Sequence, residues 1–465
     1  MAGPRDRKSA QTSAAAGIGR RAFLKRSLAC GAAFAAAPYV ITRLVFGADA
    51  PSNRVNVGQI GCGSIADYYH KNNLKEMQDV RVVAVCDAYK RRRESMAAAY
   101  GKIYGDPNGT KVYADFRELL ASKDVDAVIV AAHDNWHMPM SIAAAKAGKD
   151  VYCQKPLGLD FGLTGLLRDT VNKNKRVFQF GTQYRSEGRY RLMVQLVRNG
   201  YIGKLERIDL WSRDVSHDVD QYAVKPYGSS VEAPVPEGFD FDAWQGPSPM
   251  VPYTVDRCTR WGGFHCPETS LGFIAGCAIH ELGLAQWANK SDDTSPIRYK
   301  GTGSVPKEGI FRTLEKWDVM CDYPNGVKLH FMDYRTAKTA VGGMFSSWHP
   351  GDGVIFHGSE GWISDAEGWA TSNKALWKQE FKAADEILPV SPEHNRNFID
   401  CVKSRKETMC PVEMAIRCDA ITQLSTIAAI TGREINWDPK AEKIVNDAEA
   451  EKMLIRPYRE KWKVW

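Results

Sequence analysis

Beyond its first 50 residues, this chain of 465 residues lacks an excess of charge of either sign. The formal net charge is +7, and the first 50 residues hold eight Lys or Arg and two Asp or Glu, so they account for +6 of it. The remaining +1 offers no basic surface to nucleic acid or to an anionic membrane. The same part of the chain has no internal repeat, and no apolar run approaches the roughly 18 residues that a membrane-spanning helix needs. These absences argue against nucleic acid or a membrane as a partner of the main body.

The cysteines do not form the pattern of a disulfide scaffold or of a zinc site. Eleven cysteines in a chain of this length do not suggest a disulfide-rich domain. A metal could be imagined at Cys258, His265, Cys266, Cys277 and His280, but their spacing matches no compact zinc pattern. We therefore expect free thiols and no metal.

Residues 1–50 have the features of an export leader. They are polar and basic up to Arg26, apolar over residues 28–40, and reach small residues near Ala50. The pair Arg20-Arg21 with its following residues resembles a twin-arginine signal, which predicts export to the periplasm or cell envelope. Pro51 follows Ala50, and proline there blocks signal peptidase, so a leader retained as a membrane anchor stays open.

From residue 54 to about 180, predicted strands alternate with predicted helices. The run at residues 127–131 is continuously apolar, as expected for a strand covered on both faces. This alternation predicts an α/β fold that begins with a doubly wound parallel sheet. The predicted strands cover 55–60, 81–86, 127–131, 149–153 and 177–180, and the predicted helices cover 64–76, a run ending near 100, and 160–174.

After about residue 203 the strands become longer and their apolar residues alternate. A Pro-Asn-Gly turn at 324–326 joins two of them. We expect an α+β domain with an open, mainly antiparallel sheet, so the predicted domains are a leader (1–50), a dinucleotide-binding domain (51–185) and a C-terminal domain (186–465). The strands expected here are 205–213, 317–323, 327–333 and 354–364, residues 215–270 are expected as long loops, and helices are expected at 393–404 and 412–432, within a region that can pack back toward the first domain.

The segment Gly61–Ala66 reads G-x-G-x-x-A directly after the first strand and at the start of a helix. The first glycine allows a tight turn, the second lets the backbone approach a pyrophosphate, and the alanine allows close packing of helix and strand. Asp87 ends the second strand about 20 residues later, where a carboxylate binds the adenosine ribose. Asp87 favours NAD over NADP, although Arg91–Arg93 weaken that preference. The cofactor-binding residues predicted here are Gly61, Gly63, Ser64, Ile65, Ala66, Asp87 and Arg91.

Two further motifs follow strands, Asn135-Trp136-His137 and Gln154-Lys155-Pro156. With the glycine segment and Asp87 they stand in an order that resembles the glucose–fructose oxidoreductase and inositol dehydrogenase (Gfo/Idh/MocA) family. The resemblance extends over nearly all of residues 54–465, and the leader resembles that of exported members. Other segments that look similar are Gly181–Ser186, Asn397–Ile399 and Pro411–Glu413.

The resemblance implies a Rossmann domain, a second domain whose open sheet carries the interface of a homo-oligomer, and NAD(P)-dependent oxidoreductase activity. It implies that Lys155 contacts nicotinamide and substrate and that His280 acts as acid and base. Two positions depart from the family pattern, because Gln154 replaces a Glu and Gly276 replaces an Asp four residues before the histidine. The remaining residues predicted to bind cofactor are Asn135, His137, Gln154 and Lys155, and those predicted to bind substrate are Gln183, Tyr184, Arg185, Arg260, Trp261 and His265.

The residues themselves support a proton-transfer role at this site. Hydride transfer from an alcohol needs a positioned group that accepts the hydroxyl proton, and histidine titrates near neutral pH. If residues 276–280 form one helix, Gly276 and His280 share a face. Without a carboxylate at 276, we expect the pKa of His280 near its ordinary value, unless Glu281 or a loop group substitutes.

Three functions remain open at this point. The first is a dehydrogenase or reductase that acts on a hydroxyl carbon of a sugar, polyol or glycoside with NAD. The second is a glycoside hydrolase that uses NAD transiently, by ring oxidation, elimination and re-reduction. The third is a sugar-binding protein without catalysis, against which Lys155 argues. The sequence does not choose the sugar, the carbon or the direction of reaction.

Overall fold

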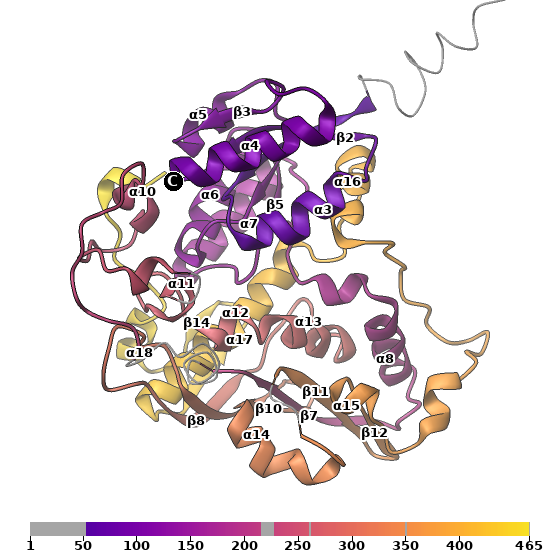
Figure 1. The fold of residues 1–465 in the computed structure, drawn as a ribbon. Coiled ribbons are helices and arrows are strands. Elements are labelled where there is room, and N and C mark those ends of the chain that lie inside the picture. The colour runs from indigo at the N-terminus through magenta and orange to yellow at the C-terminus, as the bar shows by residue number, and fades with distance from the viewer. Residues whose placement is uncertain (1–52, 215–226, 260–261, 349–350, 465) are drawn as a thin grey trace, which may run out of the picture. The chain divides into compact units, whose positions relative to one another are not determined.

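The computed structural model describes residues 53–214, 227–259, 262–348 and 351–464, and residues from Val55 onward form one compact unit. Two sheets organise this unit (Figure 1). The predicted leader lies outside the described residues. Within the part of the chain that the structure describes, no helix is both long and apolar enough to cross a membrane.

The first sheet has six strands, all parallel, as the alternation of strands and helices predicts. The strand predicted at 127–131 forms at Ala127–Val130, and all four of its residues are buried. The strand order reverses beside β1, because β1 pairs with β2 on one side and with β4 on the other. Such a switch point is where open α/β sheets bind their ligands. The strands, in sheet order, are β3 (Lys111–Tyr113), β2 (Val80–Cys86), β1 (Val55–Ile60), β4 (Ala127–Val130), β5 (Asp150–Cys153) and β6 (Phe178–Phe180).

The second sheet has eight strands, and every neighbouring pair is antiparallel except β7 and β10. The hairpin predicted at 324–326 joins β9 and β10. The single strand predicted at 354–364 is wrong, because the chain turns at Ser359-Glu360 and its two halves pair with each other. The strands, in sheet order, are β12 (Gly361–Ser364), β11 (Gly353–Gly358), β7 (Leu205–Ser212), β10 (Lys328–Asp333), β9 (Lys316–Asp322), β8 (Arg298–Ser304), β13 (Ile435–Asp438) and β14 (Lys443–Ile444).

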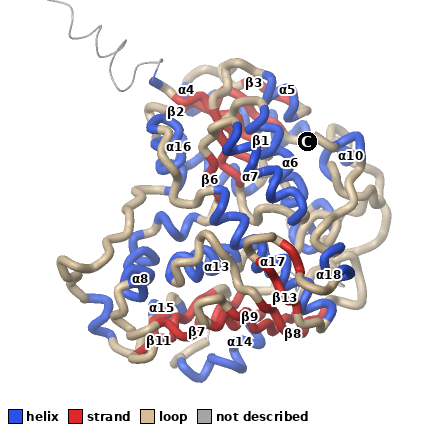
Figure 2. The backbone as a smooth tube through the Cα atoms, turned by 180° about the vertical axis from the view of Figure 1, so that it is seen from behind, coloured by secondary structure: helices blue, strands red, loops and turns tan. Residues whose placement is uncertain are grey.

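Helices cover both sheets and fill the space between them (Figure 2). The helix predicted after β1 is the π-helical segment η2 followed by α3. The helices are η2 (Ala66–His70), α3 (Lys71–Leu74), α4 (Lys90–Tyr104), α5 (Phe116–Ala121), α6 (Asp134–Lys146), α7 (Thr164–Lys173), α8 (Gly188–Arg198), α10 (Phe241–Gln245), α11 (Gly262–His265), α12 (Phe273–Gly276), α13 (Ile279–Ala288), α14 (Tyr334–Val341), α15 (Ala366–Trp369), α16 (His394–Ser404), α17 (Val412–Thr431) and α18 (Ala448–Lys452).

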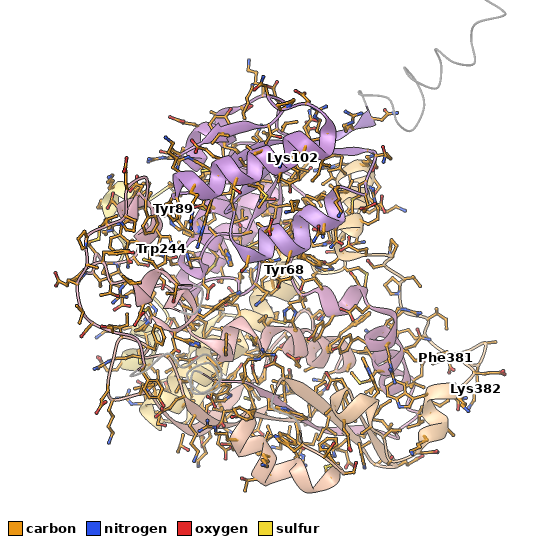
Figure 3. All side chains as sticks on the ribbon, in the orientation of Figure 1. Tyr68, Tyr89, Lys102, Trp244, Phe381 and Lys382 are labelled. Atoms are coloured by element: carbon orange, nitrogen blue, oxygen red, sulfur yellow. The ribbon has the colours of Figure 1, made fainter. Side chains whose placement is uncertain are left out.

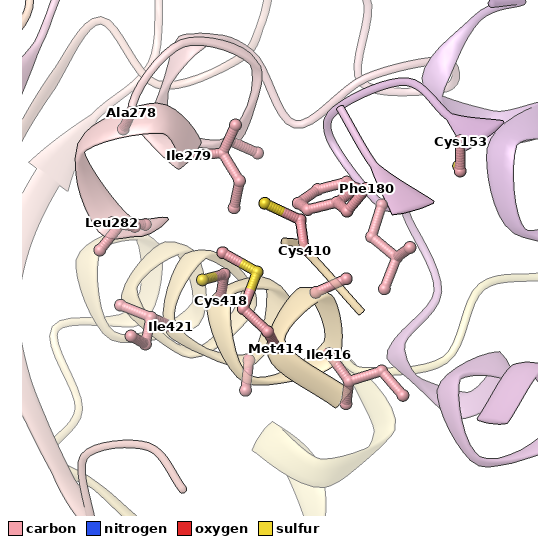
Figure 4. Close-up of a cluster of buried hydrophobic side chains, with 14 of the residues drawn as sticks. Cys153, Phe180, Ala278, Ile279, Leu282, Cys410, Met414, Ile416, Cys418 and Ile421 are labelled. Atoms are coloured by element: carbon pink, nitrogen blue, oxygen red, sulfur yellow. The ribbon is translucent and has the colours of Figure 1, made fainter. Parts of the chain in front are cut away.

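Helix α17 is buried along almost its whole length, which fits its apolar residues on all sides. Cys418 and Ile421 of α17 pack beside Ile279 and Leu282 of α13, and Phe180 of the parallel sheet lies close by (Figure 4). Helix α16 belongs to a second core cluster with strands β1 and β2. The C-terminal helices therefore contact both sheets and help to fix the space between them.

Candidate functional site

A cavity of about 1140 Å³ opens at the carboxyl ends of the parallel strands and extends to α13. Its lining includes Gly61 after β1, Asp87 after β2, Lys155 after β5 and His280 on α13. The switch point of the parallel sheet thus faces residues from the second half of the chain. Of the residues predicted to bind cofactor or substrate or to act in catalysis, those that line this cavity are Gly61, Gly63, Ser64, Ile65, Asp87, Arg91, His137, Gln154, Lys155, Gln183, Tyr184 and His280.

The glycine segment makes a cradle at one end of the cavity. Gly61 has a φ of +93°, and a Cβ there would lie 2.3 Å from the carbonyl oxygen of Ala131, so only glycine fits. Gly63 faces open space, where the nearest atom to a Cβ is in Arg92 at 4.0 Å. Ser64 begins the helix at the cavity wall, and Ala66 is buried in the core beneath it. The cradle fits the pyrophosphate of a dinucleotide.

Asp87 shapes the turn after β2 and also faces the cavity. One carboxylate oxygen accepts the backbone N–H of Cys62 at 2.8 Å, and the other accepts that of Tyr89 at 2.8 Å. Burial raises the pKa of the Asp87 carboxyl above its ordinary value. Arg91 and Arg92 line the same end of the cavity. Asp87 is therefore placed both to hold the turn and to meet an adenosine ribose.

We expect Asp87→Ala to weaken binding of both cofactors and to weaken NAD more than NADP. The turn loses two hydrogen bonds in either case, but only NADP gains from the loss of a carboxylate beside its 2′-phosphate. Calorimetric titration with each cofactor measures the two dissociation constants. Equal weakening of both would show that Asp87 has only a structural role.

Lys155 lies at the other end of the cavity. Its Nζ donates a hydrogen bond to the carbonyl oxygen of Gly276 and lies 5.7 Å from the ring centroid of Phe264. Contacts across 121 residues of sequence thus fix the ammonium group at the cavity wall. This placement brings the predicted lysine next to the segment that carries His280.

Gln154 replaces the expected glutamate without leaving a buried charge. Its Nε2 donates to Nε2 of His70 at 2.9 Å, and Nδ1 of His70 lies 2.8 Å from the amide oxygen of Asn395. Burial lowers the pKa of His70 to about 4, so this histidine is neutral near pH 7. A neutral amide at 154 matches a neutral imidazole, and the departure from the family pattern is accommodated locally.

Asp134 lines the cavity, whereas the predicted Asn135 does not. Nδ2 of Asn135 instead donates to the carbonyl oxygen of Gln245 and to Oγ of Ser248, both at 2.9 Å. Asp134 accepts the hydroxyl of Ser270 at 2.6 Å, and burial raises the pKa of its carboxyl to about 7 while the charge of Lys155 opposes that shift. Asn135 therefore does not line the cavity as predicted, because the first turn of α6 directs Asp134 into it.

His137 ties the two cavity-lining motifs together. Its Nδ1 lies 2.5 Å from the carbonyl oxygen of Pro156, and its Nε2 lies 3.1 Å from that of Ala132. The ring thus holds the turn after β5 against the start of α6. His137 supports the position of Lys155 as well as lining the cavity.

His280 is the second residue of α13, and its ring stacks on that of Tyr184 at 4.7 Å between centroids. Its Nδ1 is buried and has no hydrogen-bond partner among the described residues. Burial, and then the charge of Lys155, lower the pKa of His280 well below its ordinary value. The prediction that the pKa of His280 lies near its ordinary value is therefore wrong, because burial of the imidazole, and not only the absence of a carboxylate at position 276, sets this pKa.

Gly276 and His280 do not share one helix. Gly276 ends α12, the backbone breaks at Cys277-Ala278, and α13 begins at Ile279. The prediction that both residues lie on one helical face is wrong for this reason. The carbonyl of Gly276, freed by the end of α12, accepts the hydrogen bond from Lys155.

Tyr184 connects His280 to a group of buried polar side chains. Its ring also stacks on Tyr190 at 4.2 Å, and it forms a hydroxyl hydrogen bond with that residue. The nearby Glu281 carboxyl raises the pKa of Tyr184, and burial raises the pKa of Glu281 itself well above its ordinary value. Tyr184 thus remains a neutral phenol beside His280. Gln183 also lines the cavity, 3.4 Å from the hydroxyl of Tyr152.

Two residues predicted to bind substrate lie outside the cavity, buried in contacts with other parts of the chain. Arg185 is 3% exposed and binds both oxygens of Asp292 and the carbonyl oxygen of Gly283. His265 is fully buried and packs against Phe273, with ring centroids 4.8 Å apart. Neither residue lines the cavity as predicted, because each side chain is buried against other parts of the chain. Arg260 and Trp261 lie outside the described residues.

We expect Arg185→Ala to destabilise the protein by about 3 kcal/mol, since it leaves a buried carbonyl and a carboxylate without their partner. Denaturant unfolding measures this change. Arg298→Ala is the control, because Arg298 is half exposed in its ion pair with Asp322 and should matter by less than about 1 kcal/mol. If the variant instead has a lower affinity for substrate and unchanged stability, Arg185 binds substrate as the sequence predicts.

Several cavity-lining residues carried no recognisable signal in the sequence. They come from helix starts, short helices, loops and the C-terminal tail, and the predicted motifs do not include them. These residues are Asp134, Glu187, Arg213, Trp244, Phe264, Cys277 and Trp462. Over the described ranges, no group of three or more His, Cys, Asp or Glu residues is placed to hold a metal ion.

Two family models match the chain. Residues 55–182 match an oxidoreductase family described as having an NAD-binding Rossmann fold, and residues 358–464 match the C-terminal alpha/beta domain of an oxidoreductase family. Myo-inositol 2-dehydrogenase of Thermotoga maritima is 32% identical over 160 residues, which is 34% of this chain and 46% of that protein. Inositol 2-dehydrogenase of Rhizobium meliloti is 28% identical over 162 residues, 35% of this chain and 46% of that protein. The match thus spans less than half of each relative.

Solved structures share the fold over a longer range. The crystal structure of myo-inositol 2-dehydrogenase from Lactobacillus plantarum has a TM-score of 0.57 at 18% identity, covering 82% of this chain and 99% of that one. The WlbA dehydrogenase from Chromobactrium violaceum, in complex with NADH and UDP-GlcNAcA, has a TM-score of 0.60 at 14% identity, covering 83% of this chain and 96% of that one. At these identities the likeness shows the arrangement of the two domains.

Proposed function

Because this chain belongs to the Gfo/Idh/MocA family of oxidoreductases, we propose that it transfers a hydride between NAD and a hydroxyl-bearing carbon of a sugar or polyol. The observation that carries the proposal is the meeting of Lys155 and the segment before His280 at one end of a cavity. The glycine cradle and Asp87 occupy the other end. One cavity thus offers a dinucleotide site joined to a pair of proton-handling groups.

The residues at the end of the cavity that contains Lys155 can accept the proton of a substrate hydroxyl and orient its oxygen. Bound NAD would supply the hydride acceptor. His280 is neutral because its pKa lies well below the ordinary value, so it can accept the hydroxyl proton. Lys155 and the phenol of Tyr184 can donate hydrogen bonds that orient the hydroxyl oxygen. Asp134, whose carboxyl has a pKa of about 7, can hold or release a proton beside Lys155.

The proposed substrate class rests on the relatives and on the walls of the cavity. Curated relatives are named inositol 2-dehydrogenases, which act on a polyol. The rings of Tyr184 and Phe264 line the cavity and offer flat apolar faces of the kind that pack against sugar rings. NAD is favoured over NADP because Asp87 stands where a 2′-phosphate would lie.

The test is to mix the purified protein with NAD and a panel of free sugars and polyols and to follow the absorbance of NADH. Net NADH formation with at least one substrate is the expected result, and native mass spectrometry should detect bound NAD(H). A protein that binds neither NAD nor NADP at millimolar concentration would overturn the proposal.

A second candidate is an NAD-dependent glycoside hydrolase, which the leader favours. Arg20-Arg21 resembles a twin-arginine signal, and an exported enzyme has no evident supply of fresh NAD. Such an enzyme oxidises a ring hydroxyl, eliminates the aglycone, adds water and returns the hydride to the ring. Release of a coloured aglycone from nitrophenyl glycosides without net NADH would identify it. Conversion of free sugars with net NADH would exclude it.

Location and assembly are further parts of this proposal. The leader supports export to the periplasm or cell envelope, and the eight-stranded sheet offers a surface for a homo-oligomer. Replacing Arg20-Arg21 by Lys-Lys and fractionating cells tests export. Light scattering of the purified protein tests assembly.

A further inference from the structure

A segment from the second half of the chain crosses the cofactor end of the cavity. We call residues 236–248 the strap. The backbone N–H of Lys90 donates to the carbonyl of Gly238 at 2.8 Å, and that of Asp240 donates to the carbonyl of Ala88 at 3.0 Å. The rings of Tyr89 and Phe239 lie 5.2 Å apart. The strap is thus fastened to the turn that immediately follows Asp87.

The other end of the strap is fastened to the start of α6. Nε1 of Trp136 donates to the carbonyl of Ala243 at 3.0 Å, and Nδ2 of Asn135 donates to that of Gln245 at 2.9 Å. Gly246 has a φ of +59°, and a Cβ there would lie 2.2 Å from the Trp136 ring, so the strap needs glycine at this contact. This use of Asn135 explains a residue that the cavity itself does not use.

The two attachments lie on either side of the glycine cradle. In the parallel sheet, β1 stands between β2 and β4, and the strap is attached after β2 and after β4. It therefore passes the end of β1, where Gly61 and Gly63 form the cradle. Ala243 and Trp244 of the strap line the cavity, and Trp244 lies on the same side of the molecule as Tyr89 (Figure 3).

The C-terminal tail holds the strap by ion pairs and hydrogen bonds. Arg459 binds the carboxylate of Asp242 and donates from Nε to the carbonyls of Gly246 and Ser248, both at 2.9 Å. Lys461 binds the other oxygen of Asp242. We call Asp242, Arg459 and Lys461 the clasp. Helix α10 accordingly lies beside the C-terminus (Figure 1).

The tail also contributes to the cavity itself. Trp462 is 5% exposed, lines the cavity, and makes an edge contact with Trp136 at 5.6 Å between ring centroids. Strap and tail thus form one continuous wall that is held by ion pairs and backbone hydrogen bonds. This wall is built from residues more than 200 positions apart in the sequence.

We propose that the clasped strap slows the release of bound NAD(H) from the cavity, with Asp242 and Arg459 as the residues that position the strap. This inference rests on the proposed function, since it assumes that the cavity takes NAD. Because the strap passes the cradle, a dinucleotide bound there leaves more readily when the strap parts from the turn after β2 or from α6. The clasp opposes both movements, so it slows dissociation more than it changes the contacts with the cofactor.

The experiment measures the dissociation rate of NAD from the full-length loaded protein. Asp242→Asn removes the charge that Arg459 and Lys461 share, and we expect release of NAD at least about tenfold faster, which corresponds to about 1.4 kcal/mol. Asp322→Asn is the matched control. Asp322 is also held by one arginine and one lysine, Arg298 and Lys328, but it lies in the second sheet. Its release rate should equal that of the unmodified protein.

The outcomes separate this inference from the proposed function. Equal release rates for Asp242→Asn and the unmodified protein would overturn retention by the strap. Failure of the unmodified protein to bind NAD would overturn the proposed function instead. If Asp242→Asn does not fold, Lys461→Ala removes the exposed part of the clasp and should still speed release severalfold, and an unchanged rate there would count equally against the proposal.

Discussion

Lys155→Ala is expected to lower kcat by about 10²–10⁴-fold, the range for a positioned proton-transfer group. The dissociation constant of NAD and the midpoint of thermal unfolding should change little. Among the described residues, the ammonium group binds the Gly276 carbonyl and lies over the face of Phe264, so its loss removes one hydrogen bond at the cavity wall. Steady-state kinetics on an identified substrate, with calorimetric titration of NAD, measures both quantities.

Lys146→Ala is the control for this variant. Lys146 is exposed at the end of α6 and does not line the cavity. Its kcat should remain within a factor of two of the unmodified protein. If Lys155→Ala keeps full turnover, the assignment of the lysine is wrong, and Asp134 becomes the candidate for proton transfer beside His280.

His280→Asn should lower kcat/KM by about 10²-fold or more and should also change its pH dependence. The histidine must be unprotonated to accept the hydroxyl proton. Because burial and the charge of Lys155 lower its pKa well below the ordinary value, the unmodified enzyme should stay active at pH values well below 6.5. Activity should fall only as the pH drops through that lowered pKa, and His280→Asn should lack this acid limb.

A pH profile of kcat/KM for both proteins measures the effect. His330→Asn is the control, because His330 lies on β10 against Asp318 and outside the cavity. An acid limb that is identical with and without His280 would show that this histidine is a packing residue. Proton transfer would then fall to Lys155 or Tyr184.

Gly276→Asp should shift the acid limb of the same profile toward neutral pH. A Cβ at 276 would meet Phe264 at 3.6 Å, which is ordinary van der Waals contact, so the first atom of a side chain causes no clash. Because Lys155 binds the carbonyl of residue 276, a carboxylate introduced there should offset part of the lysine charge that lowers the pKa of His280. Gly276→Asn, which adds the same volume without charge, should leave the limb in place. A limb that does not move in Gly276→Asp would contradict this coupling.

The glycine cradle and Lys155 could be predicted because their signals are local. Gly61 and Gly63 stand at fixed spacing after a strand whose buried residues are consecutive, and a parallel strand delivers the residue that follows it to one edge of the sheet. A local motif does not show which of two consecutive side chains at the start of a helix faces the cavity. Asn135 and Asp134 differ by about 100° around α6, so an error of one residue exchanged a cavity-lining carboxylate for an amide that binds the strap.

Arg185 and His265 show a second reason why site residues cannot always be predicted from the sequence. Both are polar residues in the segments where a substrate site was expected, and both are buried against partners that no spacing in the sequence reveals. The partner of Arg185 is Asp292, 107 residues away. Whether a guanidinium faces a cavity or a carboxylate depends on this long-range contact.

The alternation of strands and helices around the parallel sheet, the glycine cradle, and the positions of Asp87 and Lys155 at the carboxyl ends of strands could all be predicted from the sequence. These features follow from hydrophobic periodicity and short-range backbone geometry, which act over a few residues. Three features became visible only in the folded chain. They are the lowered pKa of His280, the hydrogen bond from Lys155 to the Gly276 carbonyl, and the ion pair of Asp242 with Arg459. Burial and charge depend on which distant segments meet, and the free energy of such contacts is set in three dimensions rather than along the chain.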